Sequence, residues 1–162
     1  MLDRQAPCCY SHGWFQQTLR LTGQSFHWSS GRAAQVHVSK SRVLVVDDDP
    51  DVRSFLSAFL ELEGYEVQTA ANGAEALHSV AEQRPDVILL DLMMPVMDGW
   101  TFCRQLAMNH HTSHPPIIII SASHELDGRL QEAGASAFIA KPFDLDCLLS
   151  CLREQGSAAV AR

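Results

Sequence analysis

Polar side chains with reactive groups stand directly after the apolar runs of this sequence. Such runs occur at 43–46, 87–90, 117–120 and 137–140. The residues that follow them, or end them, are Asp47 and Asp48, Asp91, Ser121 and Lys141. If the runs are strands of one parallel sheet, these side chains meet at the edge where open α/β sheets place their chemistry.

The residue types in this group favour phosphoryl chemistry that depends on a cation. Clustered carboxylates repel one another by about 1 kcal/mol per pair in water, and more where solvent is reduced, so they favour a bound cation. Oxygen ligands without histidine or cysteine select a hard ion such as Mg²⁺. An aspartate can attack phosphorus as a nucleophile. Lys141 would supply positive charge to the phosphoryl oxygens, and Ser121 would supply a hydrogen bond.

Strand and helix patterns alternate from Ser41 onward. Short apolar runs predict strands, and apolar residues spaced by three or four predict helices. The strands are expected at 42–46, 65–69, 85–90, 117–120 and 137–140, and the helices at 50–63, 72–83, 100–108, 124–133 and 145–153. This alternation predicts one α/β domain with a parallel sheet and helices on both faces.

Two helix starts carry signals of their own. Asn72, with Glu75 three residues later, has the spacing of a capping box. Asp49 and Asp51 flank Pro50 at the start of the first expected helix, where negative charge and a first-turn proline are favourable. We interpret these two aspartates as capping residues.

Four motifs, in this order, resemble the receiver domains of two-component response regulators. They read VLVVDDDP, LLDLMMPVMDG, IIIISA and AKPF, and the resemblance covers about residues 41–155. It implies a flavodoxin-like, doubly wound α/β fold whose five-stranded parallel sheet has the order 2-1-3-4-5.

The resemblance also implies a set of metal and acceptor residues. Asp91 matches the aspartate that is phosphorylated. Asp47 and Asp48 match the acidic pair that positions Mg²⁺, with Asp48 the more direct ligand. Met93 matches the position whose backbone carbonyl is a further ligand of the ion.

A second set of residues is implied to sense the phosphoryl group. Ser121 matches the switch serine or threonine, and Lys141 matches the lysine that contacts phosphoryl oxygens. Phe138 matches the aromatic residue that changes rotamer on phosphorylation. The Lys141–Pro142 peptide bond is cis in many relatives, so Pro142 is a candidate cis-proline.

By the same resemblance the chain is expected to act in a phosphorelay. The expected partner is a sensor histidine kinase or a histidine phosphotransfer protein that offers phosphohistidine. The receiver would catalyse its own phosphorylation without being a turnover enzyme. Its changed surface would then signal to a downstream protein that the sequence does not identify.

Composition narrows the class of protein and its surroundings. The 162 residues carry a net charge of −7, which argues against direct DNA binding. No run is long enough for membrane insertion, and the N-terminal residues lack the apolar stretch typical of a secretory signal. Five cysteines without a CxxC pair favour a reducing cytoplasm. We expect a flexible extension over 1–40, the receiver domain over 41–155 and a short tail over 156–162.

Three other interpretations compete with this one. A phosphorylation-independent receiver-like binding module would keep the fold without the switch. A phosphatase of the haloacid-dehalogenase type matches Asp47 and Asp49 but not Asp51, where its motif has Thr or Val. An EF-hand loop starting at Asp47 fails, because Val52 and Ala58 replace the required Gly and Glu.

Overall fold

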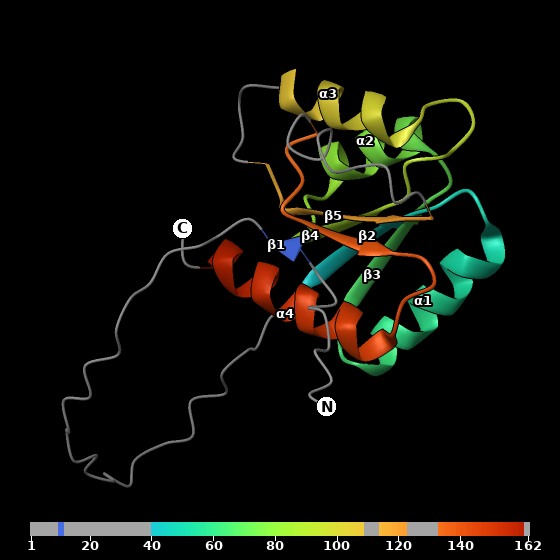
Figure 1. Cartoon of the computed structure of the whole chain (residues 1–162). Coiled ribbons are helices and arrows are strands. Elements are labelled where there is room, and N and C mark those ends of the chain that lie inside the picture. Colours follow the sequence, from blue (N-terminus) through green and yellow to red (C-terminus); the bar gives the residue numbers. More distant parts are fainter. Residues whose placement is uncertain (1–9, 12–39, 109–113, 123–132, 161–162) are drawn as a thin grey trace, which may run out of the picture.

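A mostly parallel sheet forms the middle layer of the computed structural model, which describes residues 10–11, 40–108, 114–122 and 133–160 (Figure 1). Its strands are β1 (Tyr10–Ser11), β2 (Arg42–Val46), β3 (Glu66–Ala70), β4 (Val87–Leu90), β5 (Ile117–Ser121) and β6 (Ala137–Ala140). Their order across the sheet is β1-β6-β5-β4-β2-β3. The strands from β2 to β6 are parallel. Numbered among themselves they follow 2-1-3-4-5, which confirms the predicted topology.

Among the described residues, two helices cover each face of the sheet. The helices α2 (Gly73–Glu82) and α3 (Gly99–Met108) lie on one side, and α1 (Pro50–Leu62) and α4 (Leu145–Val160) lie on the other (Figure 1). Successive residues of a strand face opposite sides, so β2 contributes Leu44 to the α2–α3 core and Val43 to the α1–α4 core. Strands buried on both faces are apolar throughout, which explains the unbroken run in β4.

The helix starts follow the expected capping pattern. Asp49 Oδ1 accepts hydrogen bonds from the backbone N–H groups of Asp51, at 2.8 Å, and Val52, at 3.4 Å. Asn72 Oδ1 accepts from Ala74 N and Glu75 N, both at 3.0 Å. These bonds satisfy N–H groups that have no partner inside the helix.

Some element boundaries differ from the sequence prediction. Strand β3 is shifted by one residue, and β5 extends to include Ser121. Helix α4 continues from the expected end at Arg153 to Val160, into residues assigned to the tail. One interior glycine costs a helix only about 1 kcal/mol, and the alanines beyond Gly156 favour helix.

Strand β1 is an element that the sequence did not reveal. It pairs antiparallel with β6, with Tyr10 opposite Phe138 and Ser11 opposite Ala137. An edge strand offers unpaired N–H and C=O groups, which can hold a short segment through the backbone without any side-chain pattern. The rest of 1–39 and the helix expected at 124–133, except for Ala133, lie outside the described residues. No helix in the described part of the chain combines the length and the apolar character needed to cross a membrane.

Candidate functional site

The strand ends bring the predicted site residues to one edge of the sheet. The backbone N–H of Asp91, just after β4, donates to Val46 O at the end of β2, at 2.8 Å. The backbone N–H of Lys141, just after β6, donates to Ser121 O at the end of β5, at 2.9 Å. These bonds continue the sheet ladder by one step and fix where the side chains begin.

An ammonium group between two carboxylates forms the centre of the site. Lys141 Nζ lies 2.7 Å from Asp91 Oδ2 and 2.9 Å from Asp47 Oδ2. The side chain of Asp47 is 6% exposed, that of Asp91 13% and that of Lys141 25%. Because the three groups are partly shielded from water, their attraction is stronger than that of a surface ion pair.

The carboxylates keep Lys141 charged. Burial by itself would lower the pKa of Lys141, but hydrogen bonds to Asp91 and Asp47, with the charges of both carboxylates, raise it above the ordinary value for lysine. Lys141 is therefore an ammonium at neutral pH and offsets part of the repulsion between the two aspartates.

Three carboxylates form a cluster that fits a hard cation. Asp47, Asp48 and Asp91 each offer one oxygen, and these oxygens lie within 4.8 Å of one another. Asp47 is buried, Asp91 is partly buried and Asp48 is exposed, so the cluster opens toward solvent on the side of Asp48. With Lys141 the four groups carry a net charge of −2. An oxygen-only donor set with this excess charge suits Mg²⁺.

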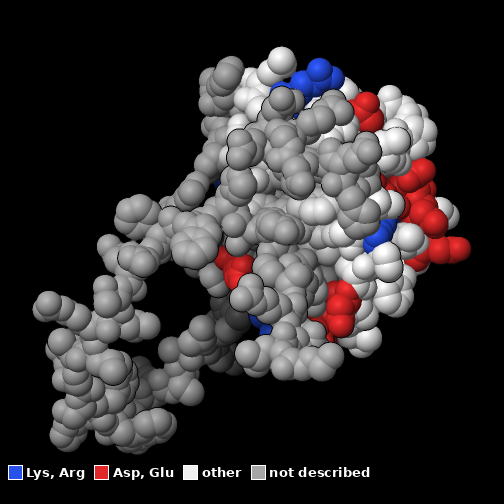
Figure 2. Space-filling model, in the orientation of Figure 1, with Lys and Arg blue, Asp and Glu red and all other residues white. Residues whose placement is uncertain are grey.

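The surrounding surface is also acidic. Figure 2 shows Asp and Glu side chains gathered where α1 begins, close to the loop that follows β2. A negative region of this kind attracts divalent cations.

The loop after β4 holds the Asp91 carboxylate in place. Met93 N donates to Asp91 Oδ1 at 3.1 Å, while the side chain of Met93 is 74% exposed. The expected metal contact of the Met93 carbonyl stays a prediction. Gly99 returns close to the same loop, because a Cβ built on it would lie 2.6 Å from Asp91 O and 2.9 Å from Leu92 Cα.

Arg53 is a supporting residue that the sequence reasoning missed. Its Nη1 donates to the backbone carbonyl of Asp47 at 2.6 Å, and Asp49 N donates to Asp47 Oδ1 at 2.9 Å. Both contacts fix the loop that carries Asp47. The sequence feature that could have pointed to Arg53 is its position one helical turn after the N-cap residue Asp49.

The remaining predicted residues lie on β5 and β6. Ser121 is 1% exposed and is the last residue of β5. Phe138 is half-buried in β6 and packs against the core on the α2–α3 side. The Lys141–Pro142 bond is cis, as the resemblance implied. The structure thus brings Asp47, Asp48, Asp91 and Lys141 together, and the switching roles of Ser121 and Phe138 stay predictions.

An apolar cleft of about 470 Å³ opens beside the ion pair. It lies between the start of α1 and the segment after β6. Its lining residues are Asp51, Val52, Phe55, Leu56, Lys141, Pro142 and Phe143. Phe55 is 55% exposed and stacks on Phe59, with ring centroids 6.5 Å apart. The cleft thus places apolar side chains next to Lys141.

Comparison with known proteins identifies relatives of the region that carries this site. The family model described as the response regulator receiver domain matches residues 43–153. The transcriptional regulatory protein PrrA of Mycobacterium bovis is 45% identical over 131 residues, which are 76% of this chain and 55% of that protein. The response regulator PleD of Caulobacter vibrioides is 49% identical over 107 residues, 64% of this chain and 23% of PleD. The chain therefore spans about half, or less, of these curated relatives.

Solved structures agree with this match. The chemotaxis protein CheY4 of Vibrio cholerae has a TM-score of 0.67 and 36% identity, covering 72% of this chain and 99% of CheY4. The BeF3-activated N-terminal receiver domain of Klebsiella pneumoniae RstA has a TM-score of 0.65 and 31% identity, covering 72% of this chain and 98% of that domain.

Proposed function

The chain belongs to the response regulator receiver domain family, and from that premise we propose that it is a switch controlled by phosphorylation of Asp91. The observation that supports this most directly is the bridge from Lys141 Nζ to Asp91 at 2.7 Å and to Asp47 at 2.9 Å, beside the exposed carboxylate of Asp48. The proposed nucleophile and the proposed metal-binding pair thus lie beside a cation that can neutralise charge.

In the proposed reaction a carboxylate oxygen of Asp91 attacks the phosphorus of phosphohistidine. The new P–O bond forms as the P–N bond to the imidazole breaks. Asp47, Asp48, Asp91 and the Met93 carbonyl would hold Mg²⁺, which when bound would supply positive charge beside the phosphoryl oxygens. Lys141 would exchange its bond to the Asp91 carboxylate for one to a phosphoryl oxygen, and the N–H of Met93 would keep the acceptor oriented.

The proposed readout passes through β5 and β6. Ser121 would hydrogen-bond the phosphoryl group, and Phe138 would then move into the space that Ser121 leaves. This change would alter the surface at β6 and α4. Both residues lie on strands that end at the site, which supports a direct coupling between the phosphoryl group and the position of Phe138.

The proposed partners follow from the same chemistry. A sensor histidine kinase or histidine phosphotransfer protein in the cytoplasm would supply phosphohistidine, and the altered surface would contact a downstream protein. The receiver would modify itself and would not turn over a substrate. The names of relatives such as PrrA describe transcriptional regulators, and we propose no direct DNA contact for the acidic region seen here.

Incubation with acetyl phosphate and Mg²⁺, followed by intact mass measurement, tests the proposal. We expect a gain of one phosphoryl group that is absent with EDTA and absent in Asp91→Asn. Asp146→Asn, which removes an exposed carboxylate from α4, is the matched control and should label normally. Failure to label with acetyl phosphate or with any phosphohistidine donor would favour the phosphorylation-independent binding module.

A further inference from the structure

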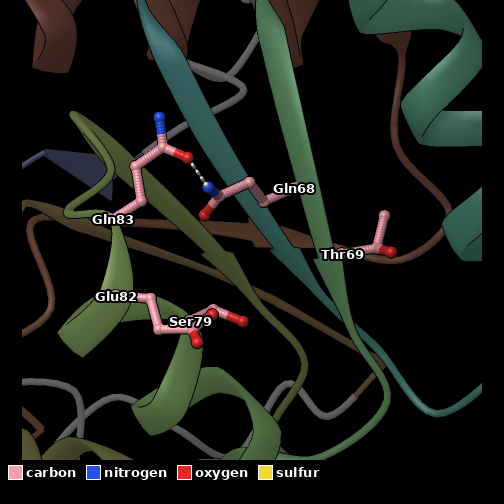
Figure 3. Close-up of a pocket in the computed structure, with 5 residues that line it drawn as sticks. All are labelled: Gln68, Thr69, Ser79, Glu82 and Gln83. Carbon is pink, nitrogen blue, oxygen red and sulfur yellow. Dashed lines mark hydrogen bonds between the residues drawn. The ribbon is translucent and has the colours of Figure 1, made fainter.

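A polar groove lies beside β3, on the side of the sheet that α2 covers (Figure 3). Its volume is about 520 Å³, and its lining residues are Gln68, Thr69, Ser79, Glu82 and Gln83. None of these residues belongs to the site around Asp91. The groove therefore needs an explanation of its own.

Gln68 contributes a buried oxygen that has no partner. Its Nε2 donates to Gln83 Oε1 at 2.7 Å, while its Oε1 is the only buried side-chain polar atom without a hydrogen bond in the described part of the chain. In Figure 3 this oxygen lies on the side of Ser79 and Glu82. A buried acceptor left without a donor costs about 1–3 kcal/mol, so the arrangement favours a ligand that donates a hydrogen bond.

A neighbouring carboxylate favours one orientation of the two amides. Gln83 Nε2 donates to Glu66 Oε1 at 3.5 Å, a long hydrogen bond between exposed side chains. Exchanging the nitrogen and oxygen of both amides would keep the bond between them, but it would place the oxygen of Gln83 against the carboxylate of Glu66. The orientation that leaves Gln68 Oε1, an acceptor, without a partner is therefore the favoured one.

The free edge of β3 adds main-chain groups to the groove. In the ladder to β2, Glu66 N donates to Ser41 O at 3.0 Å, and Ala70 O accepts from Asp47 N at 3.2 Å. The N–H and C=O groups of residues 66, 68 and 70 thus point toward β2. Because the direction alternates along a strand, the N–H and C=O groups of Val67 and Thr69 point away from β2. No strand lies beyond β3 among the described residues. Two N–H and two C=O groups are available there to an added strand.

The charged groups around the groove are mainly acidic. Glu82 is exposed and lies 3.2 Å from His78 Nε2, a contact that is an ion pair only when the histidine is protonated. Glu66 is also exposed. The next cation along the chain, Arg84, already has an interaction of its own. A ligand that carries hydrogen-bond donors and positive charge matches this set.

We propose that the groove binds an extended segment of a partner protein that carries an arginine. The main chain of the segment pairs with the edge of β3 at Val67 and Thr69. The guanidinium enters the groove and pairs with the Glu82 carboxylate, and the side chain of Gln68 turns so that its buried Oε1 accepts a second hydrogen bond from it. A planar fork of five N–H donors can serve two acceptors at once, whereas a lysine ammonium offers a single point of charge.

Titration with N-acetyl-arginine N-methylamide, followed by ¹H–¹⁵N NMR of the full chain, tests this proposal. The probe carries one guanidinium and the backbone groups of one strand residue. We expect saturable shifts confined to residues 66–69 and 79–83 and to the side-chain amide of Gln68. Glu82→Gln and Gln68→Leu should each weaken binding about tenfold or more, as loss of a hydrogen bond to a charged group predicts.

Matched probes and variants make the result decisive. Glu154→Gln, which removes an exposed carboxylate on α4, should bind the probe like the unaltered protein, and so should Asp91→Asn. N-acetyl-alanine N-methylamide and guanidinium chloride should each bind at least tenfold more weakly. The proposal would be overturned if either compound bound as tightly as the arginine probe. It would also be overturned if Glu82→Gln and Glu154→Gln had equal effects, or if no saturable shifts appeared.

Discussion

At the residue scale, Lys141 acts as the internal cation of the site. Its ammonium separates Asp47 from Asp91 and contacts both at hydrogen-bond distance. The same group is the one that the proposed reaction requires beside a phosphoryl group. Its effects on stability and on labelling can be measured separately.

Replacing Lys141 with methionine is expected to destabilise the fold. Lys141→Met would leave two partly buried carboxylates close together without their donor, at a cost of about 1.5–3 kcal/mol at neutral pH. Urea unfolding without added divalent cations measures the change. Lys40→Met, which removes an exposed lysine ahead of β2, is the control and should have little effect.

The difference in unfolding free energy between the unaltered protein and Lys141→Met should depend on pH with a definite sign. The folded-state pKa of Lys141 is raised above its unfolded value of about 10.4. The stabilisation is therefore complete below the unfolded pKa and is lost as pH rises through the folded pKa. The gap between the unaltered protein and Lys141→Met should stay constant from about pH 7 to 9.5 and shrink above that. A gap that closes between pH 7 and 9 would contradict the assignment.

At the element scale, Gly99 limits where the loop after β4 can lie. A Cβ at Gly99 would meet backbone atoms at 2.6 and 2.9 Å, so Gly99→Ala must displace the loop that carries Asp91. We expect a loss of about 1–3 kcal/mol in unfolding free energy and slower labelling by acetyl phosphate. Gly156→Ala is the control, since nothing lies within 4 Å of its added methyl. It should be neutral or stabilising by up to about 1 kcal/mol.

The pairing of β1 with β6 makes a separate prediction. Tyr10→Pro would remove the N–H that faces Phe138 across the β1–β6 pair, so the amide of Phe138, which points toward β1, should exchange faster with solvent. Gln24→Pro, a proline outside β1, is the control and should leave this amide unchanged. Equal exchange in the two variants would show that β1 does not protect β6.

The sequence predicted the helices and strands better than it predicted the loop contacts around the site. Strands such as Val87–Leu90 are buried on both faces, so their composition alone reveals them, and the order of motifs places Asp91 and Lys141 on one edge. Strand β1 was missed because it pairs through the backbone and needs no side-chain pattern. The contacts of Arg53 with Asp47 O, and of Gly99 with Asp91 O, depend on loop conformation, which composition does not encode.

At the scale of the whole molecule, the two edges of the sheet differ. The β6 edge carries the short strand β1, whereas no strand covers β3 among the described residues. The free edge borders the groove that holds the unpartnered Gln68 oxygen. The carboxyl end of the same sheet holds the acidic cluster. One sheet thus supports a chemical site at its end and a separate binding surface at its side.

Binding of Mg²⁺ to the acidic cluster should stabilise the entire domain. A ligand that binds only the folded state adds about 2.7 kcal/mol when its concentration is 100 times its Kd, which corresponds to a rise in Tm of roughly 10 °C for a domain of this size. Thermal unfolding at increasing MgCl₂, with ionic strength held constant, measures the effect. Asp48→Asn should remove most of the rise, because it takes one of the three carboxylates from the cluster. Asp51→Asn, in the first turn of α1 and outside the cluster, should retain it. A Tm that rises equally in both variants would mean that the ion binds elsewhere.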